Sequence, residues 1–139
     1  MAQAQQPNED RAEEGTDGGV DCRVVIADEN PVALDGLRAL LGVAPGVEVL
    51  RATGRRSDVL DSLATLSPDV LVIDIAWRGV DGVDLTRRIK ATWPGVKMVV
   101  LTSCVECRDD ALAAGADCFL IKGCPSAELI AAVTARSGV

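Results

Sequence analysis

Short apolar runs alternate with segments of helical periodicity along most of the chain, and this alternation restricts the folds open to it. The apolar runs cover residues 24–27, 47–52, 70–73, 96–101 and 118–121. After each run, apolar residues recur every three or four positions, as they do on one face of a helix. Because right-handed crossovers place helices on both faces of a parallel sheet, the alternation predicts a doubly wound α/β fold of five strands and five helices.

Cap and turn residues indicate where the helices begin. Asn30 and Ser57 are expected to cap the first two helices. The third helix is expected after a loop that contains Asp81-Gly82, and the last two are expected at 109–114 and 126–136. In the third helix, Leu85, Ile89 and Trp93 recur at helical spacing, so Trp93 is expected in the core. The run 70–73 is apolar on both faces, which is typical of a central parallel strand covered by helices on each side.

Charge is concentrated at the N-terminus. Residues 1–21 contain six acids and one arginine and so supply five of the seven net negative charges of the chain. This segment has no apolar stretch and is predicted to be a disordered acidic tail, with a single folded domain at 22–139. No apolar run approaches the length of about 18 residues needed to span a membrane. The folded part is nearly neutral and lacks the basic stripe that direct nucleic-acid binding requires.

The chain contains five cysteines and no export signal. That combination favours a cytoplasmic location and free thiols over a disulfide framework. Cys104, Cys107 and Cys124 fall in the loops after the fourth and fifth strands, where oxidation or a soft metal ion could link the two loops. The competing interpretation is that all three are small packing residues.

Polar residues stand at or just after the ends of four predicted strands. They are Asp28 and Glu29, Asp74, Thr102, and Lys122. Because parallel strands deliver their carboxyl ends to one edge of the sheet, these side chains are expected to converge there. Carboxylates suit Mg²⁺, and a hydroxyl with an ammonium suits a phosphoryl group. Taken singly, each residue could instead be a solvated strand end or a turn residue.

From Arg23 to about Val133 the chain resembles the receiver domain of two-component response regulators. The resemblance rests on the acidic pair, on Asp74 with Gly82 eight positions later, and on the threonine and lysine at later strand ends. The Asn-Pro step after the acidic pair, the sequence Gly-Leu-Arg-Ala-Leu-Leu and the Lys-x-x-Pro form point to the NarL/FixJ branch. The resemblance implies a flavodoxin-like sheet of order 2-1-3-4-5.

The resemblance also implies roles for individual residues. Asp74 would be the phosphoacceptor, with Thr102 and Lys122 assisting the transfer. The expected Mg²⁺ ligands are Asp28, Glu29, Asp74 and the backbone carbonyl of Ala76. Thr102 and Phe119 would form the switch that reports phosphorylation to the surface made by the fourth helix, fifth strand and fifth helix.

The implied partners are a sensor histidine kinase and either a downstream protein or the transcription apparatus. A phosphorylation-dependent homodimer is a further expectation. The chain would be a signalling phosphoacceptor that assists its own phosphoryl transfer, not an enzyme. Since it stops at Val139, it is expected to be either a stand-alone receiver or the N-terminal fragment of a DNA-binding response regulator.

Two departures from the family pattern lie beside the phosphoacceptor. Trp77-Arg78 replaces a common Met-Pro step, and Trp77 is expected on the loop that rims the metal site. Ala76 offers no polar side chain to orient water, which leaves the lifetime of the acyl phosphate open. Ala76 also disfavours a phosphatase of the haloacid dehalogenase type, which needs aspartate there, and the acidic pair disfavours a flavodoxin-like electron carrier. The remaining rival is a receiver-like module that acts by protein contacts without phosphorylation.

Overall fold

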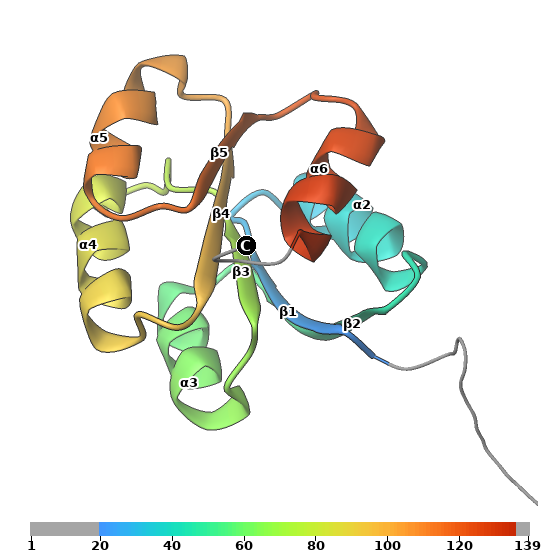
Figure 1. Ribbon diagram of the computed structural model, residues 1–139. Helices are drawn as coiled ribbons and strands as arrows, with labels where there is room; N and C mark the ends of the chain where they lie inside the picture. Colours follow the sequence, from blue (N-terminus) through green and yellow to red (C-terminus); the bar gives the residue numbers. More distant parts are fainter. Residues whose placement is uncertain (1–19, 136–139) are drawn as a thin grey trace, which may run out of the picture.

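The computed structural model describes residues 20–135 (Figure 1). The predicted acidic tail therefore lies outside the described residues except at its end, where the backbone N–H of Asp21 donates to the carbonyl of Gly46 at 2.9 Å. The last helix was expected to reach 136, which also lies outside.

Five parallel strands form one sheet in the order β2-β1-β3-β4-β5, which confirms the predicted topology. The strands are β1 (Cys22–Ala27), β2 (Val47–Thr53), β3 (Val70–Ile73), β4 (Lys97–Thr102) and β5 (Cys118–Ile121). Neighbouring strands pair in parallel, with one register shift between β1 and β2 at Val24 and Val25. The carboxyl ends of all five strands therefore meet at one edge.

Five α-helices and one short 3-10 turn cover the two faces of the sheet. They are α2 (Pro31–Gly42), α3 (Arg56–Leu66), α4 (Gly82–Thr92), η1 (Val105–Cys107), α5 (Arg108–Ala113) and α6 (Ser126–Thr134). Figure 1 shows α2 and α6 on one face and α3, α4 and α5 on the other. This is the doubly wound arrangement that the alternation predicted.

Two apolar clusters, one on each face, hold the helices to the sheet. Alternate residues of β1 point to opposite faces, so Val24 and Ile26 join one cluster while Val25 and Ala27 join the other. All four residues of β3 are buried, as expected for the central strand. Burial on both faces fixes the register of β3 and so fixes the position of the residue that follows it.

Local chemistry moves some helix ends from their predicted positions. Asn30 caps α2 as expected, because its side chain accepts from the N–H groups of Val32 and Ala33. The prediction that Ser57 caps α3 is wrong, since that helix begins at Arg56. The Thr53 hydroxyl accepts from the Arg55 N–H at 3.1 Å and so stabilises the turn that leads into the helix.

Candidate functional site

Four of the predicted site residues meet at the carboxyl edge of the sheet, around one ammonium group. Lys122 Nζ lies 2.7 Å from Asp28 Oδ2 and 2.7 Å from Asp74 Oδ2. Thr102, the last residue of β4, accepts the backbone N–H of Lys122 at its carbonyl, at 3.0 Å. Two loops contribute a carboxylate each, a third contributes the ammonium, and the end of β4 contributes a backbone carbonyl, although Asp28 and Lys122 lie far apart in the sequence.

The two carboxylates are held in place by the loops that carry them. Asp28 Oδ1 accepts the backbone N–H of Asn30 at 2.9 Å, and Asp74 Oδ1 accepts that of Ala76 at 2.8 Å. Each aspartate therefore uses one oxygen to stabilise its own turn and directs the other toward Lys122. Both side chains are nearly buried, with residue exposures of 1% and 9%.

Lys122 and its partners alter one another's protonation. Burial by itself would raise the pKa of Asp74, but hydrogen bonds from Lys122, the Ala76 N–H and Thr102 outweigh it, and the pKa lies below its ordinary value. Burial would lower the pKa of Lys122, yet the hydrogen bonds to Asp28 and Asp74 raise it. At neutral pH the site therefore holds an ionised carboxylate beside a cation.

Glu29 occupies a more open position than Asp28. Its Oε1 accepts the backbone N–H of Arg78 at 3.3 Å, which ties the loop after β1 to the loop after β3. The Ala76 residue between Asp74 and Arg78 is exposed. The acidic pair and the loop that follows the phosphoacceptor candidate are thus side by side.

The oxygen atoms present suit a hard cation. Asp28 Oδ2 is buried and lies 2.7 Å from the Lys122 ammonium. Within residues 20–135, no three acidic, histidine or cysteine side chains form a ready-made metal cluster. Mg²⁺ is commonly bound through only one or two carboxylates, with water and phosphate oxygens completing the shell. Asp28 and Asp74 meet that requirement.

Trp77 lies on the loop between β3 and α4, but its side chain packs into the core. It is 7% exposed and belongs to the apolar cluster beneath α3, α4 and α5, where its indole Nε1 is buried without a hydrogen-bond partner. Trp93 was expected in the core but caps the end of α4 and is only half-buried, packed against the same cluster. The indole ring of Trp77 has a large apolar surface, and the free energy gained by burying it exceeds the cost of leaving one N–H without a partner.

Gly82 has a steric role that its spacing from Asp74 did not reveal. A Cβ atom there would overlap the backbone carbonyl oxygen of Ile75. Only glycine therefore fits at position 82, where α4 comes close to the loop after β3. The sequence shows a glycine eight positions after Asp74, but the physical reason for it is the packing of α4 against Ile75.

The two candidate switch residues lie on β4 and β5, which pair with each other. Thr102 is fully buried, and its hydroxyl accepts the backbone N–H of Cys104 at 3.3 Å. Phe119 is half-buried and packs against the cluster that contains Trp77.

The expectation of free thiols is wrong for two of the cysteines. Cys104 and Cys107 form a disulfide, whereas Cys22, Cys118 and Cys124 are free. The reason is local: the 3-10 turn brings the two Cα atoms to 5.5 Å, within the range that a disulfide spans. The bond closes one loop on itself and does not join the loops after β4 and β5.

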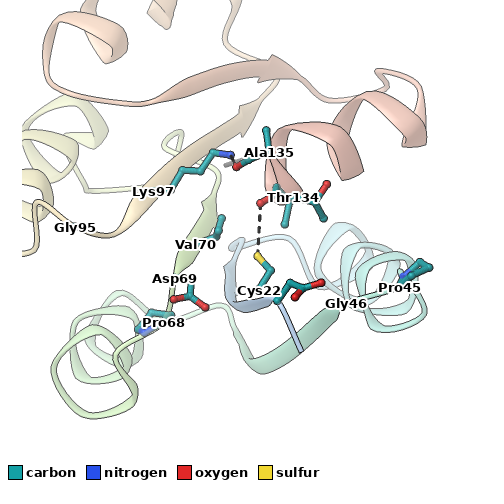
Figure 2. Close-up of a pocket in the computed structure, with 12 residues that line it drawn as sticks. Cys22, Pro45, Gly46, Pro68, Asp69, Val70, Gly95, Lys97, Thr134 and Ala135 are labelled. Carbon is teal, nitrogen blue, oxygen red and sulfur yellow. Dashed lines mark hydrogen bonds between the residues drawn. The ribbon is translucent and has the colours of Figure 1, made fainter. Parts of the chain in front are cut away.

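A cavity of about 420 Å³ lies at the opposite, amino edge of the sheet (Figure 2). Lys97 and Ala135 line it, and Lys97 Nζ donates to the Ala135 carbonyl at 2.7 Å. A dashed line in Figure 2 marks the hydrogen bond from the Cys22 thiol to the carbonyl of Val133 at 3.5 Å. None of the clustered site residues lines this cavity, so it is separate from the candidate site.

Comparison with known proteins identifies the family. The model of the response regulator receiver domain matches residues 24–134. The chain belongs to this family and is a receiver domain of the two-component response regulator class.

Relatives with curated descriptions place the chain near the NarL/FixJ branch. The transcriptional regulatory protein LiaR of Bacillus subtilis is 33% identical over 83% of this chain and 56% of its own length. The response regulator GacA of Pseudomonas viridiflava is 28% identical over 80% of this chain and 53% of its own. The chain spans about half the length of these relatives. A protein-glutamate methylesterase of Myxococcus xanthus is 35% identical over 66% of this chain, but over only 26% of that enzyme.

Solved structures agree with the fold. The receiver domain of a putative NarL response regulator from Mycobacterium tuberculosis has a TM-score of 0.75 at 23% identity, covering 82% of this chain and 94% of that one. RcsB from Salmonella enterica, solved on promoter DNA with the phosphomimetic BeF₃⁻, has a TM-score of 0.73 at 25% identity and covers 81% and 66%. Within the described part of the present chain, no helix is both long and apolar enough to cross a membrane.

Proposed function

We propose that Asp74 is the phosphoacceptor of this receiver and takes its phosphoryl group from a sensor histidine kinase. The observation that carries the proposal is the contact of one ammonium, Lys122 Nζ, with both Asp28 and Asp74 at 2.7 Å. The lowered pKa of Asp74 keeps its carboxylate ionised and so nucleophilic. A carboxylate oxygen attacks phosphorus as the phosphorus–nitrogen bond of the kinase phosphohistidine breaks. The electron pair of that bond returns to the imidazole, and an acyl phosphate remains on the receiver.

Asp28, Asp74 and the Ala76 carbonyl would hold Mg²⁺, with Glu29 at the edge of the shell. When bound, Mg²⁺ supplies positive charge that offsets the charge of the incoming phosphoryl oxygens. Lys122 contributes a second positive charge on a flexible stem and can turn from the carboxylates toward the phosphoryl group. Thr102 offers a hydroxyl donor on the neighbouring strand end. The receiver thus assists its own phosphorylation as a signalling protein, without turning over a substrate.

The output proposed for this domain is a change of surface. Thr102 would move toward the phosphoryl group, and Phe119 would follow into the vacated space, which alters the face made by α5, β5 and α6. That face would bind a downstream protein, the transcription apparatus or a second copy of this chain. The proposed setting is the cytoplasm, where a kinase and its receiver can meet.

Intact-mass measurement tests the chemistry directly. With Mg²⁺ and a small phosphodonor such as acetyl phosphate, the full chain should gain one phosphoryl group. Asp74→Asn or EDTA should abolish the gain, whereas Asp35→Asn, an exposed aspartate on α2, should retain it. Equal labelling of the wild-type chain and the Asp74→Asn variant would refute the assignment.

A further inference from the structure

The loop after β4 carries a disulfide that none of the proposed chemistry uses. Cys104 and Cys107 close a four-residue ring that contains Val105 and Glu106. Val105 is 62% exposed and Glu106 is also exposed, while both cysteines are only half-buried. Thiols and disulfides of small molecules can therefore reach the ring from solvent.

The ring contacts the candidate phosphorylation site through its first cysteine. The backbone N–H of Cys104 donates to Thr102 Oγ1 at 3.3 Å, and the side chain of the same threonine helps to lower the pKa of Asp74. The Thr102 carbonyl accepts from the Lys122 N–H at 3.0 Å. Any shift of Cys104 is thus transmitted to the residue that links Asp74 to Lys122.

The second cysteine contacts the interior. Cys107 packs against the apolar cluster that Phe119 also packs against, and it directly precedes α5. One end of the ring therefore contacts the residue that would sense a phosphoryl group, and the other packs against the same apolar cluster as the residue that would relay the signal.

We propose that Cys104 and Cys107 form a reversible dithiol–disulfide site whose oxidation state controls phosphorylation of Asp74. The inference rests on the proposed function of Asp74. The oxidant is a low-molecular-weight disulfide. One cysteine thiolate attacks it to give a mixed disulfide and one released thiol. The other cysteine then displaces the second thiol, so two electrons and two protons leave the protein for each ring closed.

The closed ring opposes phosphorylation. A phosphoryl group adds three oxygens beside Thr102, so the segment that follows must adjust to admit them. A disulfide across four residues restricts the backbone of that segment, and the open dithiol does not. Because coupling between two sites is reciprocal, a phosphoryl mimic on Asp74 should in turn favour the dithiol.

A redox titration of the full chain tests the coupling in both directions. Trypsin releases residues 98–108, a peptide that carries Cys104 and Cys107 and no other cysteine. After equilibration in glutathione buffers of graded ratio and alkylation, the mass of this peptide reports dithiol against disulfide. Adding Mg²⁺ with BeF₃⁻ should shift the equilibrium toward the dithiol by about fivefold or more. Asp74→Asn should abolish the shift.

The converse arm compares acetyl phosphate labelling of oxidised and reduced protein. Labelling of the oxidised chain should be slower than that of the reduced chain, and the Cys104→Ser/Cys107→Ser double variant should label equally under both conditions. Cys124→Ser, a free cysteine after β5, should keep the wild-type difference. Equal labelling of oxidised and reduced wild-type protein, or a peptide that never forms the disulfide, would overturn this inference alone. No labelling in either state would overturn the proposed function and, with it, the inference.

Discussion

Lys122 forms ion pairs with two buried carboxylates, those of Asp28 and Asp74. These ion pairs make the stability of the domain depend on pH. The pKa of Asp74 is lowered, so its stabilising contribution is present above the ordinary value of about 3.9 and is lost as pH falls through the native pKa. The pKa of Lys122 is raised, so its contribution is present below about 10.4 and is lost as pH rises through the native pKa. Both contributions are present at neutral pH.

Lys122→Met should lower the free energy of unfolding by about 2 kcal/mol at pH 7, because it leaves Asp28 and Asp74 buried without a cation. The deficit should shrink below about pH 4, where protonation of Asp74 removes its repulsion with Asp28. Urea unfolding at a series of pH values measures both effects. Arg88→Met, which removes an exposed ion pair with Asp84, serves as the control and should change stability by less than about 1 kcal/mol. A deficit that does not vary with pH would contradict the account.

Trp77 lies three residues after Asp74 and is buried, so its emission should respond to events at the site. Mg²⁺ with BeF₃⁻ is expected to change tryptophan fluorescence of the wild-type chain. Trp77→Phe should remove most of the change, while Trp93→Phe, at the far end of α4, should retain it. The reverse pattern would show that the signal comes from α4 and not from the loop after β3.

Among the elements, the junction of β3 with α4 decides where Asp74 stands. Asp81 caps α4 by accepting the N–H of Asp84 at 3.0 Å, and Gly82 begins the helix against the Ile75 carbonyl. The buried strand fixes one end of this loop and the capped helix fixes the other. The acidic loop after β1 joins it through Glu29 and Arg78.

Gly82→Ala should destabilise the domain by about 2 kcal/mol, because the added Cβ forces α4 away from Ile75. Gly36→Ala is the matched control: Gly36 lies inside α2 with nothing within 4 Å of the added atom. That change should stabilise the domain by about 1 kcal/mol, since alanine is the better helix former. Thermal unfolding measures both changes in stability. An unchanged stability of the Gly82→Ala variant would show that α4 can move away from Ile75 at little cost.

In the whole molecule, the charged cluster and the cavity lie at opposite edges of the sheet. The clustered charges lie at the carboxyl edge, whereas the cavity of Figure 2 lies at the amino edge, where the described chain ends at Ala135. In the proposed switch, Thr102, at the end of β4, and Phe119, on β5, would connect the face made by α5, β5 and α6 to the charged edge. A partner on that face could respond to the charged edge without touching it.

If a second copy of the chain is that partner, Mg²⁺ with BeF₃⁻ should raise the sedimentation mass from monomer to dimer. The reason is that phosphorylation would reshape the α5, β5 and α6 face on every copy, and a closed dimer pairs identical faces. Asp74→Asn should remain monomeric under the same conditions. An unchanged mass for the wild-type chain would exclude the dimer and leave a different protein as the partner.

The fold and the grouping of the charged residues could be predicted from the sequence because both follow from periodicity. Alternating strands and helices imply a parallel sheet, and Asp28, Asp74, Thr102 and Lys122 all stand at or just after strand ends that such a sheet brings together. The strand order came only from the family resemblance, since periodicity contains no information about which strands are neighbours.

Packing decided the rest. Whether Trp77 lies inward, why Gly82 must be glycine, and that Cys104 pairs with Cys107 all depend on distances between segments or on the shape of one turn. The same is true of Lys122, whose contact with both carboxylates depends on the relative positions of three loops. A pattern along the chain records which residues are apolar or charged, but only the folded backbone fixes which of them come within bonding distance.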